Sequence, residues 1–298
     1  MPPRFARFIA IDWSGARQPA AQRRAIVCCV VEGHRVTALE GGRDRQEIVA
    51  WLADQGAAAV PTLVGLDCPF AYAAPFLDHL RAPDFAALLA RIGPLEGPPE
   101  TGHCADAFIT RCGRWWARWS QGEDHGRTRR HVERVAATRG AESPLRALPE
   151  GSGYRFVGPR QVGKAAITGI AALAALKARI PGARVWPFED PAGASLVLAE
   201  IWPRLALAGV VKSDRAARQR YVRALADCGV QLRPEHRRSA VASDHAVDAL
   251  AAAVAMASGR WPVLERSALP PVAVREGWIL GVEPPCRTGL RTRPRRTR

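Results

Sequence analysis

The chain has 298 residues, and 48% of them are hydrophobic, which is enough to bury a sizeable core. No apolar run approaches the roughly 20 residues that a membrane-spanning helix needs, and the segment Met1 to Arg4 leads into a strand pattern without the apolar stretch of a signal peptide. The seven cysteines are scattered and form no C-x-x-C pair, which argues against a disulfide framework or a zinc ribbon. We therefore expect a cytoplasmic globular protein that does not contact a membrane.

The chain is strongly basic, with a formal net charge of +15 and a pI near 10.7. Such a charge favours a polyanionic partner, in particular nucleic acid, either DNA or RNA. However, only three of the 43 basic residues are lysines, and an excess of arginine also arises from the codon usage of a GC-rich genome. Six arginines fall within residues 287–298, which have almost no apolar content and are predicted to form a disordered basic tail.

Local patterns predict both strands and helices along the chain. The expected strands are Phe5–Asp12, Arg24–Val31, Arg35–Leu39, Thr62–Asp67, Ala183–Phe188 and Ser195–Trp202, with a short strand at Val230–Leu232 and an edge strand within Glu276–Val282. The expected helices are Asp44–Gln55, Ala73–Ile92, Gln161–Arg179, Asp214–Cys228 and Ser243–Ser258. Ser243 is the expected N-cap of the last helix, because serine readily accepts a hydrogen bond from a free backbone N–H. The order predicts an α/β fold whose mixed central sheet combines an antiparallel three-strand meander with parallel strands, flanked by helices.

The segment at about residues 104–160 is the least regular part of the chain. Between residues 111 and 139 it carries eight arginines around Trp115, Trp116 and Trp119, a mixture that can hold a phosphate backbone and stack bases. Arg129 and Arg130 are our candidates for contacts with substrate phosphates. The alternative is a helix whose tryptophans pack inward and whose arginines are solvated.

Acidic residues stand where apolar runs begin or end. Asp12, Asp67 and Glu200 each close an apolar strand, whereas Asp244 and Asp248 lie four residues apart in the first turn of the last helix and share one face. A carboxylate at the end of a buried strand lies at the rim of the sheet, where a bound cation can offset its desolvation. Each acid taken singly is more often a turn or helix cap, but several at one rim favour a metal site.

Five short motifs resemble those of an uncharacterised family of predicted ribonuclease H-like nucleases. They are IAIDWSG (9–15), GLDCPF (65–70), AEIWP (199–203), SDHAVDAL (243–250) and EGWI (276–279), and the likeness spans about residues 7–282. The last helix also resembles the D-x-x-x-D-A signature of resolvase-type nucleases with a ribonuclease H-like fold. The resemblance implies a single ribonuclease H-like domain over residues 1–286, with the arginine- and tryptophan-rich segment as an insertion.

The predicted function is a divalent-metal-dependent nuclease that hydrolyses phosphodiester bonds by a two-metal-ion mechanism. Oxygen ligands select Mg²⁺ or Mn²⁺ rather than zinc. We expect Asp12 to bind both ions, Asp67 to bind one, and either Asp244 or Asp248 to bind the other. The remaining candidates are Glu200 as a further catalytic acid at the same rim, with Lys164 and His245 as phosphate contacts or proton carriers.

Two other functions fit parts of the sequence. The segment 12–15 after the first strand also resembles the first phosphate loop of actin-like and sugar-kinase-like proteins, which would make the chain a phosphotransferase or an ATPase, although no second copy of that motif occurs. A non-catalytic nucleic-acid-binding protein of the same fold is the third hypothesis, favoured by the arginine-rich tail.

Overall fold

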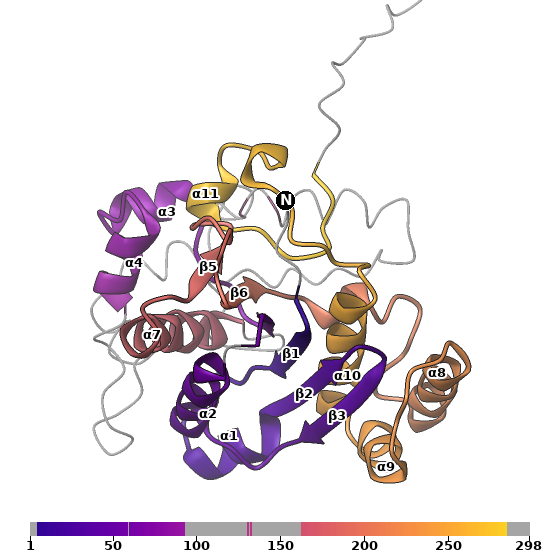
Figure 1. Ribbon diagram of the computed structural model, residues 1–298. Helices are drawn as coiled ribbons and strands as arrows, with labels where there is room; N and C mark the ends of the chain where they lie inside the picture. The colour runs from indigo at the N-terminus through magenta and orange to yellow at the C-terminus, as the bar shows by residue number, and fades with distance from the viewer. Residues whose placement is uncertain (1–4, 59, 93–129, 131, 133–161, 285–298) are drawn as a thin grey trace, which may run out of the picture.

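The computed structural model describes residues 5–58, 60–92, 130, 132 and 162–284 (Figure 1). The strands are β1 (Arg7–Asp12), β2 (Val27–Glu32), β3 (Arg35–Glu40), β4 (Thr62–Leu66), β5 (Arg184–Trp186) and β6 (Leu196–Glu200). The α-helices are α1 (Pro19–Ala25), α2 (Arg45–Ala57), α3 (Ala74–His79), α4 (Phe85–Ile92), α7 (Gly163–Arg179), α8 (Arg215–Asp227), α9 (Pro234–Ala242), α10 (Asp244–Ala257) and α11 (Ala273–Glu276). Short 3₁₀ turns lie at Pro203–Leu205 and Arg266–Ala268. The predicted insertion, apart from residues 130 and 132, and the predicted tail lie outside the described residues.

The six strands form one mixed sheet in the order β3-β2-β1-β4-β6-β5. Strands β1, β2 and β3 are antiparallel neighbours, while β4 is parallel to both β1 and β6, and β5 is parallel to β6. The predicted α/β class and the mixed sheet are therefore confirmed. An additional helix, α1, separates β1 from β2, and its last turn contains Arg24, where the second strand was expected to begin.

Helices cover both faces of the sheet, as Figure 1 shows. The face that carries Ile9 and Ile11 packs in one apolar cluster with α2, α3, α4 and α7. The other face, which carries Ala10, packs against α10 and, at β3, against α9, while α8 packs on α9. Successive side chains of a strand point to opposite faces of the sheet, so neighbouring residues on one strand pack against different sets of helices.

Several predicted elements differ from the observed ones. The expected helix over 73–92 is two helices, because the chain turns at Arg81 with a φ of 53°, which a continuing α-helix does not permit. The expected strand at 230–232 forms only one isolated bridge, from Gln231 to Arg35, and the expected edge strand only one, from Ile279 to Glu200. Helix α9 was missed, since its sequence is polar and only Pro234 in its first turn marks it.

No helix within the described ranges is both long enough and apolar enough to cross a membrane.

Candidate functional site

Asp12 and Asp67 lie side by side at the carboxyl ends of two parallel strands. The strands β1 and β4 pair Ile11 with Leu66, so the next residue on each strand occupies the same position along the edge. The backbone N–H of Asp67 donates to the carbonyl of Ile11 at 3.0 Å, which continues this register beyond β4. Because side chains alternate along a strand, both aspartates point to the same face of the sheet as Ala10, which is the α10 side. A hydrogen bond joins the two carboxyl groups there.

Helix α10 brings a third carboxylate to this pair. The hydroxyl of Ser243 accepts a hydrogen bond from the N–H of Ala246 at 3.2 Å, so the predicted N-cap is confirmed. The helix packs on β1 and β2, and Asp248, one turn along it, is only 3% exposed. Asp244 at the helix start is partly exposed, and its carboxylate accepts from the backbone N–H of His245 at 3.1 Å. Asp248 is therefore the residue of this pair that joins the buried cluster.

Burial and repulsion between neighbouring carboxyl groups raise the pKa values of Asp67 and Asp248. Burial raises the pKa of Asp67 well above its ordinary value, and the charges of Asp12 and Asp248 raise it further. Burial also raises the pKa of Asp248 to about 6, with repulsion from Asp12 adding to the effect and the charge of Lys212 opposing it. Perturbed pKa values of this kind are typical of functional sites. We call Asp12, Asp67 and Asp248 the acidic cluster.

Two basic side chains contact the acidic cluster. The ammonium group of Lys212 donates to Oδ2 of Asp248, and Nδ1 of His245 lies 2.5 Å from Oδ2 of Asp12. The hydrogen bond to Asp12 raises the pKa of His245. Burial lowers the pKa of Lys212, but the attraction of Asp248 raises it overall. His245 was a predicted site residue, whereas Lys212 was missed; the signal for it was the rarity of lysine in an arginine-rich chain.

Glu200 lies on the opposite face of the same edge. The register pairs Glu200 with Leu66, and both point toward the α7 side, whereas Asp67 is one residue further on and points the other way. The guanidinium of Arg130 forms two hydrogen bonds with the Glu200 carboxylate, at 2.6 and 2.7 Å, and both side chains are buried. The backbone N–H of Phe70 donates to the same carboxylate at 3.0 Å. Glu200 therefore does not join the acidic cluster, and Arg130, expected as a phosphate contact, has its charge neutralised inside the core.

Lys164 also stays apart from the acidic cluster. It lies in the first turn of α7, on the face opposite α10, and its side chain has no hydrogen bond or ion pair with any described residue. Its backbone packs closely on the loop after β1, because a Cβ placed on Gly15 would lie 2.7 Å from Lys164 and 2.6 Å from the backbone nitrogen of Ala165. Only glycine fits there. Arg129 lies outside the described residues.

The acidic cluster thus brings together carboxyl groups from the ends of two strands and from a helix, together with two basic side chains. Among the residues that the structure describes, no group of three or more histidine, cysteine, aspartate or glutamate side chains is arranged to hold a metal ion. Comparison of the chain with protein-family models, with curated proteins and with solved structures gives no match in any of the three.

Proposed function

We propose that this protein is a divalent-metal-dependent nuclease with a ribonuclease H-like fold, and that Asp12, Asp67 and Asp248 bind its metal ions. One observation carries the proposal: three carboxylates that are far apart in sequence meet at the carboxyl end of the central strands. The antiparallel hairpins β1–β2–β3 beside parallel β4 and the acid on the last long helix support the fold assignment.

The donor atoms of the acidic cluster are of the kind that a hard divalent cation prefers, although the described side chains are not arranged as a ready-made metal site. Carboxylate oxygens are the ligands that Mg²⁺ and Mn²⁺ prefer, and the raised pKa values of Asp67 and Asp248 reflect repulsion and desolvation that a cation would relieve. Lys212 and His245 supply part of this positive charge. Each of these side chains is 43% exposed, so each can release its carboxylate and turn toward solvent at little cost. We infer that metal binding displaces them.

The displaced cations have roles in phosphodiester cleavage. A bound divalent ion would activate water and stabilise the leaving oxygen. Lys212 could then contact a phosphate oxygen, since ammonium groups pair readily with phosphate. His245, once released from Asp12, could donate a proton to the leaving group, because imidazole titrates near neutral pH.

The decisive test is cleavage of single-stranded, duplex and branched DNA and of RNA with Mn²⁺ or Mg²⁺. Asp12→Asn is expected to abolish cleavage while the protein still folds and shows a cooperative thermal unfolding transition, because the change removes a charge and preserves shape. The matched control is Asp54→Asn, an exposed aspartate on α2, which should cleave like the wild type. If Asp12→Asn cleaves as fast as the wild type, the proposed site is wrong.

The same purified protein can be used to test the two alternative functions. Hydrolysis of ATP that depends on Asp12, without cleavage of any nucleic acid, would favour the phosphotransferase or ATPase hypothesis. Binding of nucleic acid that neither Mn²⁺ nor Mg²⁺ converts to cleavage would favour a non-catalytic binding protein of the same fold.

A further inference from the structure

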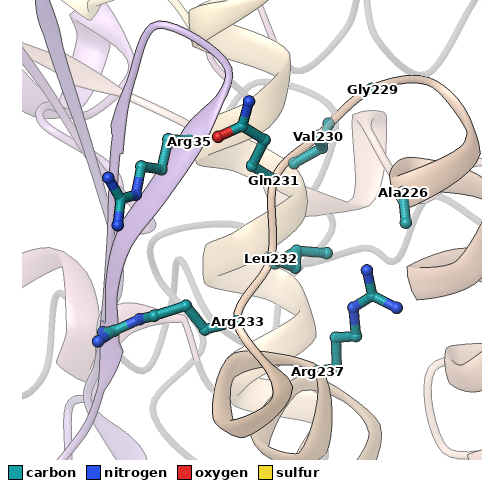
Figure 2. A pocket seen from close by; sticks show the side chains of 8 residues that line it. All are labelled: Arg35, Ala226, Gly229, Val230, Gln231, Leu232, Arg233 and Arg237. Carbon is teal, nitrogen blue, oxygen red and sulfur yellow. The ribbon is translucent and has the colours of Figure 1, made fainter.

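Two adjoining hollows lie along the helices α8 and α9. The first, of about 460 Å³, is lined by Arg35, Ala226, Gly229, Val230, Gln231, Leu232, Arg233 and Arg237. Figure 2 shows Arg35 on the strand side of this hollow and Arg237 rising from α9. The second, of about 470 Å³, is lined by Arg215, Gln219, Val222, Arg223, Arg237, Arg238, Val241 and Ala242. Because Arg237 lines both, the hollows form one continuous surface, which we call the α8–α9 track.

The α8–α9 track is basic and its charge is largely uncompensated. Six arginines line it, and none of the described residues in either wall is acidic. Arg233 pairs with Glu235 at 3.1 Å. The side chains of Arg215, Arg223, Arg237 and Arg238 are exposed and form no ion pair or hydrogen bond with any residue that the structure describes. Concentrated positive charge in a concave surface attracts polyanions and focuses their approach.

A buried arginine holds the two helices of the track together. The Nε of Arg218 on α8 donates to the carbonyl of Val241 at 2.9 Å, and its other nitrogens donate to the carbonyls of Lys212 and Ala242. Arg218 is only 8% exposed, so it acts inside the protein and leaves the outer arginines free. The wall of the track is thereby fixed before any ligand binds, which reduces the entropy cost of binding.

The α8–α9 track ends beside the acidic cluster. Ala242 lines the second hollow, and Asp244, two residues later, begins α10. Consecutive Cα atoms lie about 3.8 Å apart, so this end of the track is within about 8 Å of the helix that carries Asp248. Lys212, whose carbonyl Arg218 holds, contacts Asp248 directly. One buried residue therefore connects the basic track to the candidate active site.

We propose that the α8–α9 track binds the phosphate backbone of nucleic acid and leads the strand to the acidic cluster. Helix α9 has nine residues, and at about 1.5 Å per residue it is about 13 Å long, which matches about four nucleotides at 3.4 Å each. The choice of nucleic acid over other polyanions rests on the proposed nuclease function. The arginines contact phosphates and therefore position the strand without reading its bases.

An anionic membrane fits this surface less well. Membrane-binding basic surfaces also insert apolar side chains below the headgroups. In the described part of the chain, the exposed large hydrophobic residues are Val211 and Val274, and neither lines the track. The concave walls also suit a strand that enters between them better than a flat lipid surface.

The test measures binding apart from cleavage. The full chain is titrated against labelled oligothymidine in EDTA at several salt concentrations, by fluorescence anisotropy. The double variant Arg223→Ala with Arg237→Ala should bind more weakly and should reduce the slope of log K against log salt by about 1.4, at about 0.7 for each lost contact on a single strand. Arg223→Lys with Arg237→Lys should retain most of the slope, because the positive charges remain.

The matched control removes two charges outside the track. Arg220→Ala with Arg266→Ala changes one exposed arginine on the same helix and one in a distant turn, and it should leave the slope nearly unchanged. Equal slopes for the two alanine pairs would overturn the proposal, and so would tighter binding to phosphatidylcholine–phosphatidylserine vesicles than to the oligomer. If the salt slopes are as expected but the wild type cleaves nothing with Mn²⁺, the proposed nuclease function is wrong. The proposal that the α8–α9 track binds the phosphate backbone would then still stand.

Discussion

Two charged clusters lie at the same edge of the sheet, and they differ in how their charges are balanced. On the α7 side, the Glu200 carboxylate and the Arg130 guanidinium are buried together, with matched charges and short hydrogen bonds. On the α10 side, three carboxylates face two cations that are partly open to solvent. The charges of the first cluster balance inside the protein, while in the second burial, together with repulsion between the carboxyl groups, raises the pKa values of Asp67 and Asp248. An acidic residue at a strand end is therefore not by itself a candidate for metal binding. Glu200 is neutralised by Arg130, whereas the acidic cluster has more carboxyl groups than basic partners.

The largest effect is expected when the closed cluster is broken. Arg130→Met should destabilise the fold by about 3–5 kcal/mol, because it leaves the Glu200 carboxylate buried without a partner. Urea unfolding measures the loss. Adding Glu200→Gln to the same chain should recover part of it, since the amide carries no charge and can still accept from Phe70. A loss below about 1 kcal/mol for Arg130→Met would mean that this pair does not hold the core.

Removing a charge from the acidic cluster should raise the free energy of unfolding, whereas breaking the Glu200–Arg130 pair lowers it. The pKa of Asp248 is raised in the folded state to about 6, so its contribution to stability is greatest below the unfolded pKa and is lost as the pH rises through about 6. Asp248→Asn should therefore stabilise the protein by up to about 3 kcal/mol at pH 8, without divalent ions. At pH 3 the variant and the wild type should be equal. Urea unfolding at both pH values decides, and a variant less stable than the wild type at pH 8 would contradict the repulsion.

Divalent ions should stabilise the folded protein by binding to the acidic cluster and not to Glu200. Mn²⁺ at ten times its Kd should raise the free energy of unfolding by about 1.4 kcal/mol in the wild type. Asp67→Asn should abolish this gain, whereas Glu200→Gln, although less stable throughout, should show the same gain. Thermal melts with Mn²⁺ and with EDTA give the comparison. An equal gain in all three proteins would place the ion elsewhere.

The smallest effect concerns the imidazole. Because the pKa of His245 is raised in the folded state, its pairing with Asp12 stabilises the fold fully below the unfolded value of 6.5 and is lost as the pH rises through the folded value. The side chain is 43% exposed, so solvent screening keeps the contribution below about 1 kcal/mol. His245→Gln should flatten the dependence of stability on pH above pH 6. A steeper dependence in the variant would show that another group titrates in that range.

Much of this arrangement was predictable from local patterns. Asp12 and Asp67 end apolar runs that form buried strands, and Ser243 begins a helix with a side-chain cap, so each position follows from its immediate neighbours in sequence. The break at Arg81 was not predictable in this way, since the apolar spacing continues through it. Helix α9 was missed for the opposite reason, because most of its exposed surface is polar.

By itself, the sequence determined which residues end the strands, which helix carries the third acid, and that the chain is basic. Only the tertiary structure decided that Glu200 and Asp67, at the ends of neighbouring strands, belong to different sites, because a shift of one residue in strand register reverses the face to which a side chain points. It also decided that Arg130 is a buried partner and that Lys212 and His245 are the cations of the acidic cluster. These pairings join residues up to 233 positions apart, and such contacts depend on how the sheet and its helices pack rather than on any local preference.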